Sequence, residues 1–179
     1  MNTHTTQNGF TLVETLVAIA VLLLVIIGPM TVAQKGIQNA YFAKEQVTAT
    51  FLAQEAIEAV REKRDADALS VYKGGTSNVD TADWMPSCTS GCAYNVANNS
   101  FGACSFYNGC LLKINDDGNY NYTSGAGSPF TRIVTTGTTM NGATPVSVDV
   151  SWNAKIFGAA TRHVILQTWI YDQYQRYEP

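Results

Sequence analysis

Charged side chains are scarce in this chain of 179 residues. Asp, Glu, Lys and Arg make up 14% of it, whereas about 25% is usual in soluble globular proteins. The 11 Lys and Arg residues are scattered and the formal net charge is −3, so we expect no broad nucleic-acid surface. A hydrophobic content of 46% with so small a net charge also argues against disorder. The length suits one compact domain with one additional element.

Residue patterns for catalysis are also lacking. Neither a G-x-S-x-G nucleophile motif nor a Gly-rich phosphate loop occurs. Of the two histidines, only His163 lies beyond the N-terminal segment, in the middle of a predicted strand. Because one face of such a sheet is solvated, we interpret His163 as a surface or edge residue rather than a general base. The sequence therefore predicts a protein that is not an enzyme and needs no cofactor.

The apolar residues are concentrated near the N-terminus. Residues 16–27 read LVAIAVLLLVII, without a polar interruption. The wider run over residues 10–33 forms about 36 Å of helix, enough to cross a bilayer core of about 30 Å. A secretory signal peptide usually begins with basic residues, yet no Lys or Arg precedes Lys35. We therefore predict a single transmembrane helix rather than a cleaved secretory signal.

A carboxylate lies within this apolar run. Burying ionised Glu14 in lipid would cost about 2.5–3.5 kcal/mol on the lenient insertion scale. One interpretation is that Glu14 is an acidic residue tolerated near the positive end of the helix dipole. The other is that it is a specific partner for a buried cation. The residues that precede it favour the second interpretation.

Residues 9–14 read GFTLVE, which resembles the cleavage and methylation motif of type IV prepilins and pseudopilins. The resemblance covers this motif and the apolar helix behind it. It implies that residues 1–9 are a leader peptide cut after Gly9 and that the new N-terminal residue, Phe10, is then N-methylated. Glu14 would be the fifth residue of the mature chain, where the family carries a glutamate.

The same resemblance gives Glu14 a role in assembly. The Glu14 carboxylate of one subunit would pair with the Phe10 ammonium of a neighbour. Because an unpaired charge is costly in an apolar bundle, this pair would set axial register more than affinity. The implied partners are other pilin subunits, the prepilin peptidase, the inner-membrane assembly platform and, before assembly, membrane lipid. The leader departs from the family's usual pattern, since it has His4 but neither Lys nor Arg.

The helix is expected to continue beyond the membrane. Gly28-Pro29 predicts a kink or local melting, because proline removes a backbone donor and clashes with the preceding turn. Over residues 34–69, small and apolar side chains recur at spacings of three and four, as on one face of a helix. They are Ala49, Leu52, Ala53, Ala56 and Val60. We expect one long helix over about residues 10–68, with its C-terminal half packed against a globular head.

Four cysteines lie close together in the predicted head, residues 70–179. They are Cys88, Cys92, Cys104 and Cys110. Their gaps do not show the paired C-x2-C spacing of a zinc ribbon. A membrane-anchored protein whose head leaves the cytoplasm enters an oxidising compartment, where disulfides persist. We therefore predict two disulfides rather than a metal site.

Two disulfide pairings compete. Asn98-Asn99 is a turn signal, and a hairpin centred there would place Cys92 near Cys104 and Cys88 near Cys110. We favour this nested pairing. The main alternative joins neighbours along the chain, Cys88 with Cys92 and Cys104 with Cys110.

The rest of the head shows strand signals. Residues 146–152 alternate apolar and polar side chains, and residues 162–171 and 130–135 are predicted to pair with them in an antiparallel sheet. Asp117-Gly118 predicts a hairpin turn. Asp116 and Asp117 are a weak calcium candidate, because some pseudopilin heads bind calcium. The sheet would lay one face on the helix, giving an α+β fold that resembles the pilin architecture.

These features predict a structural subunit of a type IV pilus-like filament, used in adhesion, motility or surface attachment and closest to a minor pilin. Before assembly it would be a single-pass cytoplasmic membrane protein with its head outside. The alternatives are a pseudopilin of a type II secretion system and a competence pseudopilus subunit, which helps take up DNA. A more distant alternative is a membrane-anchored binding protein or hydrolase. No direct nucleic-acid contact is expected.

Overall fold

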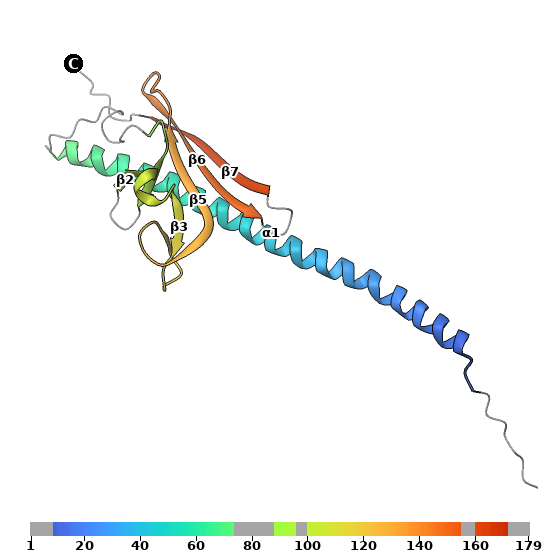
Figure 1. Ribbon diagram of the computed structural model, residues 1–179. Coiled ribbons are helices and arrows are strands. Elements are labelled where there is room, and N and C mark those ends of the chain that lie inside the picture. Colours follow the sequence, from blue (N-terminus) through green and yellow to red (C-terminus); the bar gives the residue numbers. More distant parts are fainter. Residues whose placement is uncertain (1–8, 74–87, 96–99, 155–159, 172–179) are drawn as a thin grey trace, which may run out of the picture. The chain divides into compact units, whose positions relative to one another are not determined.

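The computed structural model describes residues 9–73, 88–95, 100–154 and 160–171 (Figure 1). Residues 1–8 of the predicted leader and the predicted turn at Asn98-Asn99 lie outside these ranges. Contacts divide the chain into two compact units, Met1–Ala43 and Lys44–Pro179. One long N-terminal helix, an antiparallel sheet of seven strands and two disulfides make up the structure, which confirms the predicted α+β, pilin-like class.

Helix α1 runs without a break from Leu12 to Tyr72. The predicted helix is confirmed, but the option of local melting at Gly28-Pro29 is wrong, because Pro29 lies inside the continuous helix. Proline removes only one donor from the backbone ladder, and the turns on both sides keep theirs. The Thr31 hydroxyl also donates to the Gly28 carbonyl at 2.7 Å. A kink at this point stays a prediction.

In the unit Met1–Ala43, the apolar side chains of α1 are solvent-exposed. No described residue of this unit is buried, and Leu24 and Val32 each keep at least 70% of their surface exposed. Within the described residues, α1 is one helix long and apolar enough to span a membrane. A helix that is apolar on all sides needs lipid or other helices around it. This property fits a membrane-anchored protein.

The unit Lys44–Pro179 combines the C-terminal part of α1 with the sheet. Strand β5 is central. It pairs with β6 along one edge, and with β3 and the first residue of β1, Cys92, along the other. Among the described strands, β7 pairs only with β6, and all pairings are antiparallel. The strands are β1 Cys92–Asn95, β2 Ser100–Ala103, β3 Leu111–Ile114, β4 Tyr120–Asn121, β5 Ala126–Thr136, β6 Ala143–Ala154 and β7 Ala160–Tyr171.

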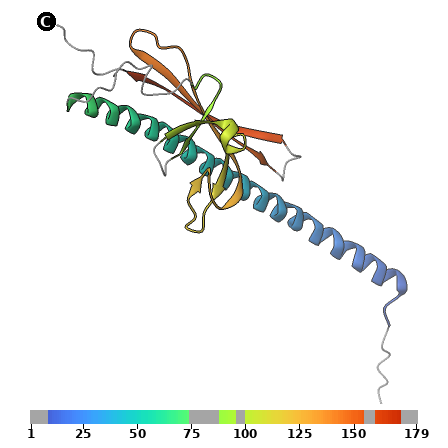
Figure 2. The ribbon, with the colours of Figure 1, turned by 60° about the vertical axis from the view of Figure 1, so that its left-hand side comes forward.

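The core of this unit lies between α1 and one face of the sheet. The small and apolar helix residues that sequence periodicity selected are all buried, and so are Val146, Val148 and Val150 of β6. Figures 1 and 2 both show this part of α1 lying along the sheet. Alanines on the helix keep the two layers close, whereas valines and aromatic side chains fill the sheet side. The predicted amphipathic packing is confirmed.

The two disulfides join neighbours along the chain. Cys88 is bonded to Cys92 and Cys104 to Cys110, with Cα atoms 5.3 and 4.7 Å apart. The favoured nested pairing is therefore wrong, although the hairpin on which it rested forms. Strands β1 and β2 pair in antiparallel register with Cys92 opposite Ala103.

Local turns explain why the cysteines pair with their neighbours. The Gly91 amide donates to the Cys88 carbonyl at 3.0 Å, and Gly91 has a φ of +92° that favours glycine. A 3-10 helix, Cys104–Tyr107, begins where β2 ends, and the Gly109 amide donates back to the Cys104 carbonyl at 2.9 Å. Each turn places a cysteine next to its neighbour along the chain instead of next to the cysteine on the other strand of the hairpin.

The predicted hairpin at Asp117-Gly118 is confirmed. Strands β3 and β4 pair across it, and the Gly118 amide donates to the Asn115 carbonyl at 3.0 Å. Gly118 has a φ of +82°, a conformation that L-residues with a side chain rarely adopt. The weak calcium candidate, Asp116 and Asp117, lies in this turn. Within the described part of the chain, no three His, Cys, Asp or Glu side chains gather at one place. Calcium also takes Asn and backbone oxygens, so calcium at this turn stays a prediction.

Candidate functional site

The start of α1 carries the residues that the sequence singled out for assembly. Thr11 caps the helix: its side-chain oxygen accepts a hydrogen bond from the Glu14 amide at 3.3 Å, and its carbonyl accepts one from the Thr15 amide at 3.2 Å. Glu14 is then the third helical residue, where a glutamate complements both a threonine cap and the positive end of the helix dipole. The local sequence thus begins a helix and places a carboxylate in its first turn.

Glu14 has no cationic partner among the described residues of its own chain. Phe10, two residues before the helix, keeps 80% of its side chain exposed. The apolar surface of α1 follows directly behind both residues. A free carboxylate at the entrance of an exposed apolar helix is suited to pairing with a cation on another molecule, because it would otherwise be costly to transfer into an apolar surrounding.

A second cluster, which the sequence analysis missed, surrounds Arg132 in the head. Arg132 lies on β5 and is completely buried. Its Nη1 donates to the Glu55 carboxylate at 3.1 Å and to the Leu52 carbonyl at 3.2 Å, both on α1. Its Nε donates to the Tyr122 hydroxyl at 3.0 Å and its Nη2 to the Tyr94 carbonyl at 3.4 Å. One guanidinium therefore ties the helix to the sheet.

The Tyr122 hydroxyl is part of the same cluster. It donates to the Arg132 carbonyl at 3.1 Å, and the Tyr122 ring lies 5.4 Å from the guanidinium carbon. Burial raises the pKa of the Tyr122 phenol above its ordinary value, although the positive charge of Arg132 opposes the shift. Burial also raises the pKa of Tyr94, with the nearby carboxylate of Glu62 acting in the same direction.

These shifts predict that the head loses stability in alkali. A folded-state pKa above the ordinary value of about 10 means that the unfolded chain releases these protons first as the pH rises. The free energy of unfolding should therefore fall progressively above about pH 10. Urea unfolding at a series of pH values, followed by fluorescence, measures this slope. Tyr122→Phe should make the slope shallower, and an unchanged slope would contradict this account of Tyr122.

His163 lies on the outward face of the sheet, as predicted. Its Nδ1 is 3.0 Å from an oxygen of Asp149 on the neighbouring strand, and about half of its side-chain surface is exposed. The register places Ser151 directly opposite His163. This is an open strand surface, where solvent reaches the imidazole. His163 and Asp149 therefore form a solvated pair across two neighbouring strands.

Comparison with known proteins gives a match at the N-terminus. Residues 4–28 match a family described as the prokaryotic N-terminal methylation motif. No curated protein and no solved structure matches the chain. The matched segment contains Gly9, Phe10 and Glu14 and the start of the exposed apolar helix. Pilin-type proteins with this motif are structural, assemble with other pilin subunits and are processed by prepilin peptidase. The N-terminal segment of this chain is a prepilin-type methylation signal of the type IV pilin and pseudopilin superfamily.

Proposed function

We propose that this protein is a structural subunit of a type IV pilus-like filament. The single observation that carries the proposal is the methylation motif, which leads directly into an exposed apolar helix. Prepilin peptidase would cut after Gly9, and α1 would leave the bilayer for a bundle of equivalent helices from other subunits. In the bundle, neighbouring helices replace lipid around the apolar side chains that the isolated chain exposes, so these side chains stay out of water when α1 leaves the bilayer.

The charge at the helix start supports the same proposal. Cleavage after Gly9 creates an α-ammonium group on Phe10, and Glu14 is the nearest carboxylate along the mature chain. Pairing between these groups on neighbouring subunits satisfies both charges inside the bundle and fixes how far one helix slides past the next. Two short disulfide loops in the head fit an oxidising compartment outside the cytoplasm.

Mass spectrometry on two fractions, sheared surface filaments and washed membranes, tests the proposal. We expect a peptide that begins at Phe10 and carries one methyl group, abundant in the sheared fraction. Processed protein confined to the membrane fraction would instead favour a pseudopilin of a secretion or competence system. Protein that keeps residues 1–9 in both fractions would contradict the proposal as a working mechanism.

A further inference from the structure

The outward face of the sheet carries a groove on the side away from α1. It has a volume of about 430 Å³, within the usual range for small-molecule sites. Side chains alternate between the two faces of a strand, so Pro145 and Ser147 of β6 point away from the buried Val146 and from α1. Thr135 of β5 and Gln167 of β7 flank Ser147 in register, and the three form a polar row.

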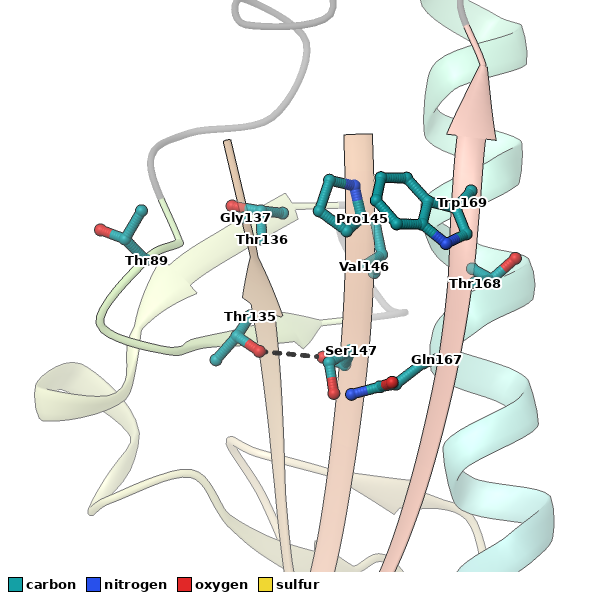
Figure 3. A pocket seen from close by; sticks show the side chains of 10 residues that line it. All are labelled: Thr89, Thr135, Thr136, Gly137, Pro145, Val146, Ser147, Gln167, Thr168 and Trp169. Atoms are coloured by element: carbon teal, nitrogen blue, oxygen red, sulfur yellow. Dashed lines mark hydrogen bonds between the residues drawn. The ribbon is translucent and has the colours of Figure 1, made fainter. Parts of the chain in front are cut away.

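An exposed indole forms one wall of the groove. Trp169 lies opposite Pro145 (Figure 3). The residue is 54% exposed. Pro145 in turn packs tightly on Gly137, where an added Cβ would come within 2.6 Å of the proline ring. The Gly137 amide also donates to the Pro145 carbonyl at 2.9 Å. These contacts with Gly137 hold Pro145 in place, and Pro145 in turn lies opposite the Trp169 indole.

Two uncharged polar side chains of the groove, Gln167 and Trp169, are open to a ligand. The Thr135 hydroxyl donates to the Ser147 carbonyl at 3.3 Å, and Figure 3 shows the Gln167 side chain extending toward Ser147. Neither the Gln167 amide nor the Trp169 indole N–H has a hydrogen-bond partner among the described residues. They offer donors and an acceptor beside an apolar surface. The lining residues are Thr89, Thr135, Thr136, Gly137, Pro145, Val146, Ser147, Gln167, Thr168 and Trp169.

We propose that this groove binds a neutral saccharide. None of the described residues that line the groove is charged, so they do not offset the desolvation of an anionic or cationic ligand. A flat indole with hydroxyl and amide groups at its side matches a ligand that has an apolar C–H face and a rim of hydroxyl groups. A sugar ring has both, and the groove volume accommodates one or two such rings. The site would add ligand recognition to a filament subunit.

Nuclear magnetic resonance of the full chain tests this directly. The chain is held in micelles of a phosphocholine detergent, which has no sugar headgroup, and is titrated separately with maltose, cellobiose and diacetylchitobiose. We expect at least one of these neutral disaccharides to shift the Trp169 indole resonance saturably. The indole of the buried Trp152 should not move, so it serves as an internal reference. N-acetylneuraminic acid, which is anionic, should bind more weakly than the neutral sugars.

Variants separate the groove from the rest of the strand. Trp169→Ala removes the reporting indole, so binding to the variants is followed through the backbone amide resonances of Thr135 and Ser147, which line the groove. Trp169→Ala should weaken binding about tenfold or more, since stacking on an aromatic side chain contributes strongly to affinity. Gln167→Met keeps the volume but removes the amide, and should weaken binding severalfold. The matched control is Ile165→Ala, which removes an equally exposed side chain from the same strand and face outside the groove. It should leave binding unchanged.

Three results would overturn the proposal. The first is that no neutral sugar shifts the Trp169 indole resonance, even at the highest soluble concentration. The second is that Trp169→Ala binds the sugar as tightly as the unaltered chain. The third is that the shift depends on the protein concentration and not on the sugar concentration. The last result would mean that the groove contacts a second copy of the chain. Because the titration uses unassembled protein, its outcome does not depend on processing after Gly9, and failure here leaves the filament proposal standing.

Discussion

Subunits that carry Glu14→Gln should be cut after Gly9 as usual but should fall about tenfold or more in sheared filaments. Glutamine preserves the length of the side chain and remains acceptable at the third position of a capped helix. Only the charge is lost. A charge-assisted hydrogen bond contributes about 1.5–3 kcal/mol, which corresponds to about 10-fold to 100-fold in incorporation if the Phe10 ammonium is left unpaired. Quantitative immunoblots of sheared and membrane fractions measure the ratio.

Two further variants show which property of the helix start matters. Thr11→Ala removes the cap of α1, worth about 1 kcal/mol, but keeps the Glu14 carboxylate. Glu45→Gln removes the same charge from a position further along α1. Both should assemble nearly as well as the unaltered chain. Normal assembly of Glu14→Gln, or an equal loss in Thr11→Ala, would contradict the pairing between Glu14 and Phe10.

Local sequence signals predicted the helix and the strands well. Three- and four-residue spacing on α1 selected residues that are all buried, because a long helix against a sheet can bury only one face. Alternation over β6 likewise predicted which side chains face the helix. The start of α1 was the most specific signal, since a glycine, a phenylalanine and a glutamate fall in register ahead of a long apolar run.

The disulfide pairing and the Arg132 cluster were not predicted, for different physical reasons. The nested disulfide pairing assumed that the chain continues straight beyond each strand of the hairpin. Instead, turns at Gly91 and Gly109 reverse the chain within a few residues. Arg132 was missed because an arginine in a strand is usually taken as solvent-facing. One signal was available: Arg132 has the same parity as Phe130 and Val134, both buried, so alternation alone places it inside. Its partners come from three distant segments, which no local pattern reveals.

Replacing Arg132 should have the largest effect on the stability of the head. Arg132→Met should lower the free energy of unfolding by about 3–5 kcal/mol, because several buried hydrogen-bonding groups each lose a partner at a cost of about 1–3 kcal/mol. Methionine fills much of the volume, but the Leu52 and Tyr94 carbonyls and the Tyr122 hydroxyl lose the guanidinium, and the Glu55 carboxylate loses its cation. Arg132→Lys should be nearly as damaging, because an ammonium cannot reproduce a planar fork with several donors. Urea unfolding followed by tryptophan fluorescence, to which the buried Trp152 contributes, gives these values.

The matched control is Arg61→Met on the exposed side of α1. Arg61 also pairs with a glutamate, Glu58, and donates to the Thr168 hydroxyl of β7 at 3.4 Å. Its side chain is 44% exposed, so the change should cost no more than about 1 kcal/mol. Glu55→Gln tests the charge pair alone. Glu55 keeps 40% of its side chain exposed and the guanidinium keeps its other acceptors, so we expect a smaller loss than in Arg132→Met. If Arg132→Met were no worse than Arg61→Met, the cost of burying the guanidinium would cancel its bonds. The cluster would then fix how α1 sits on the sheet without adding to stability.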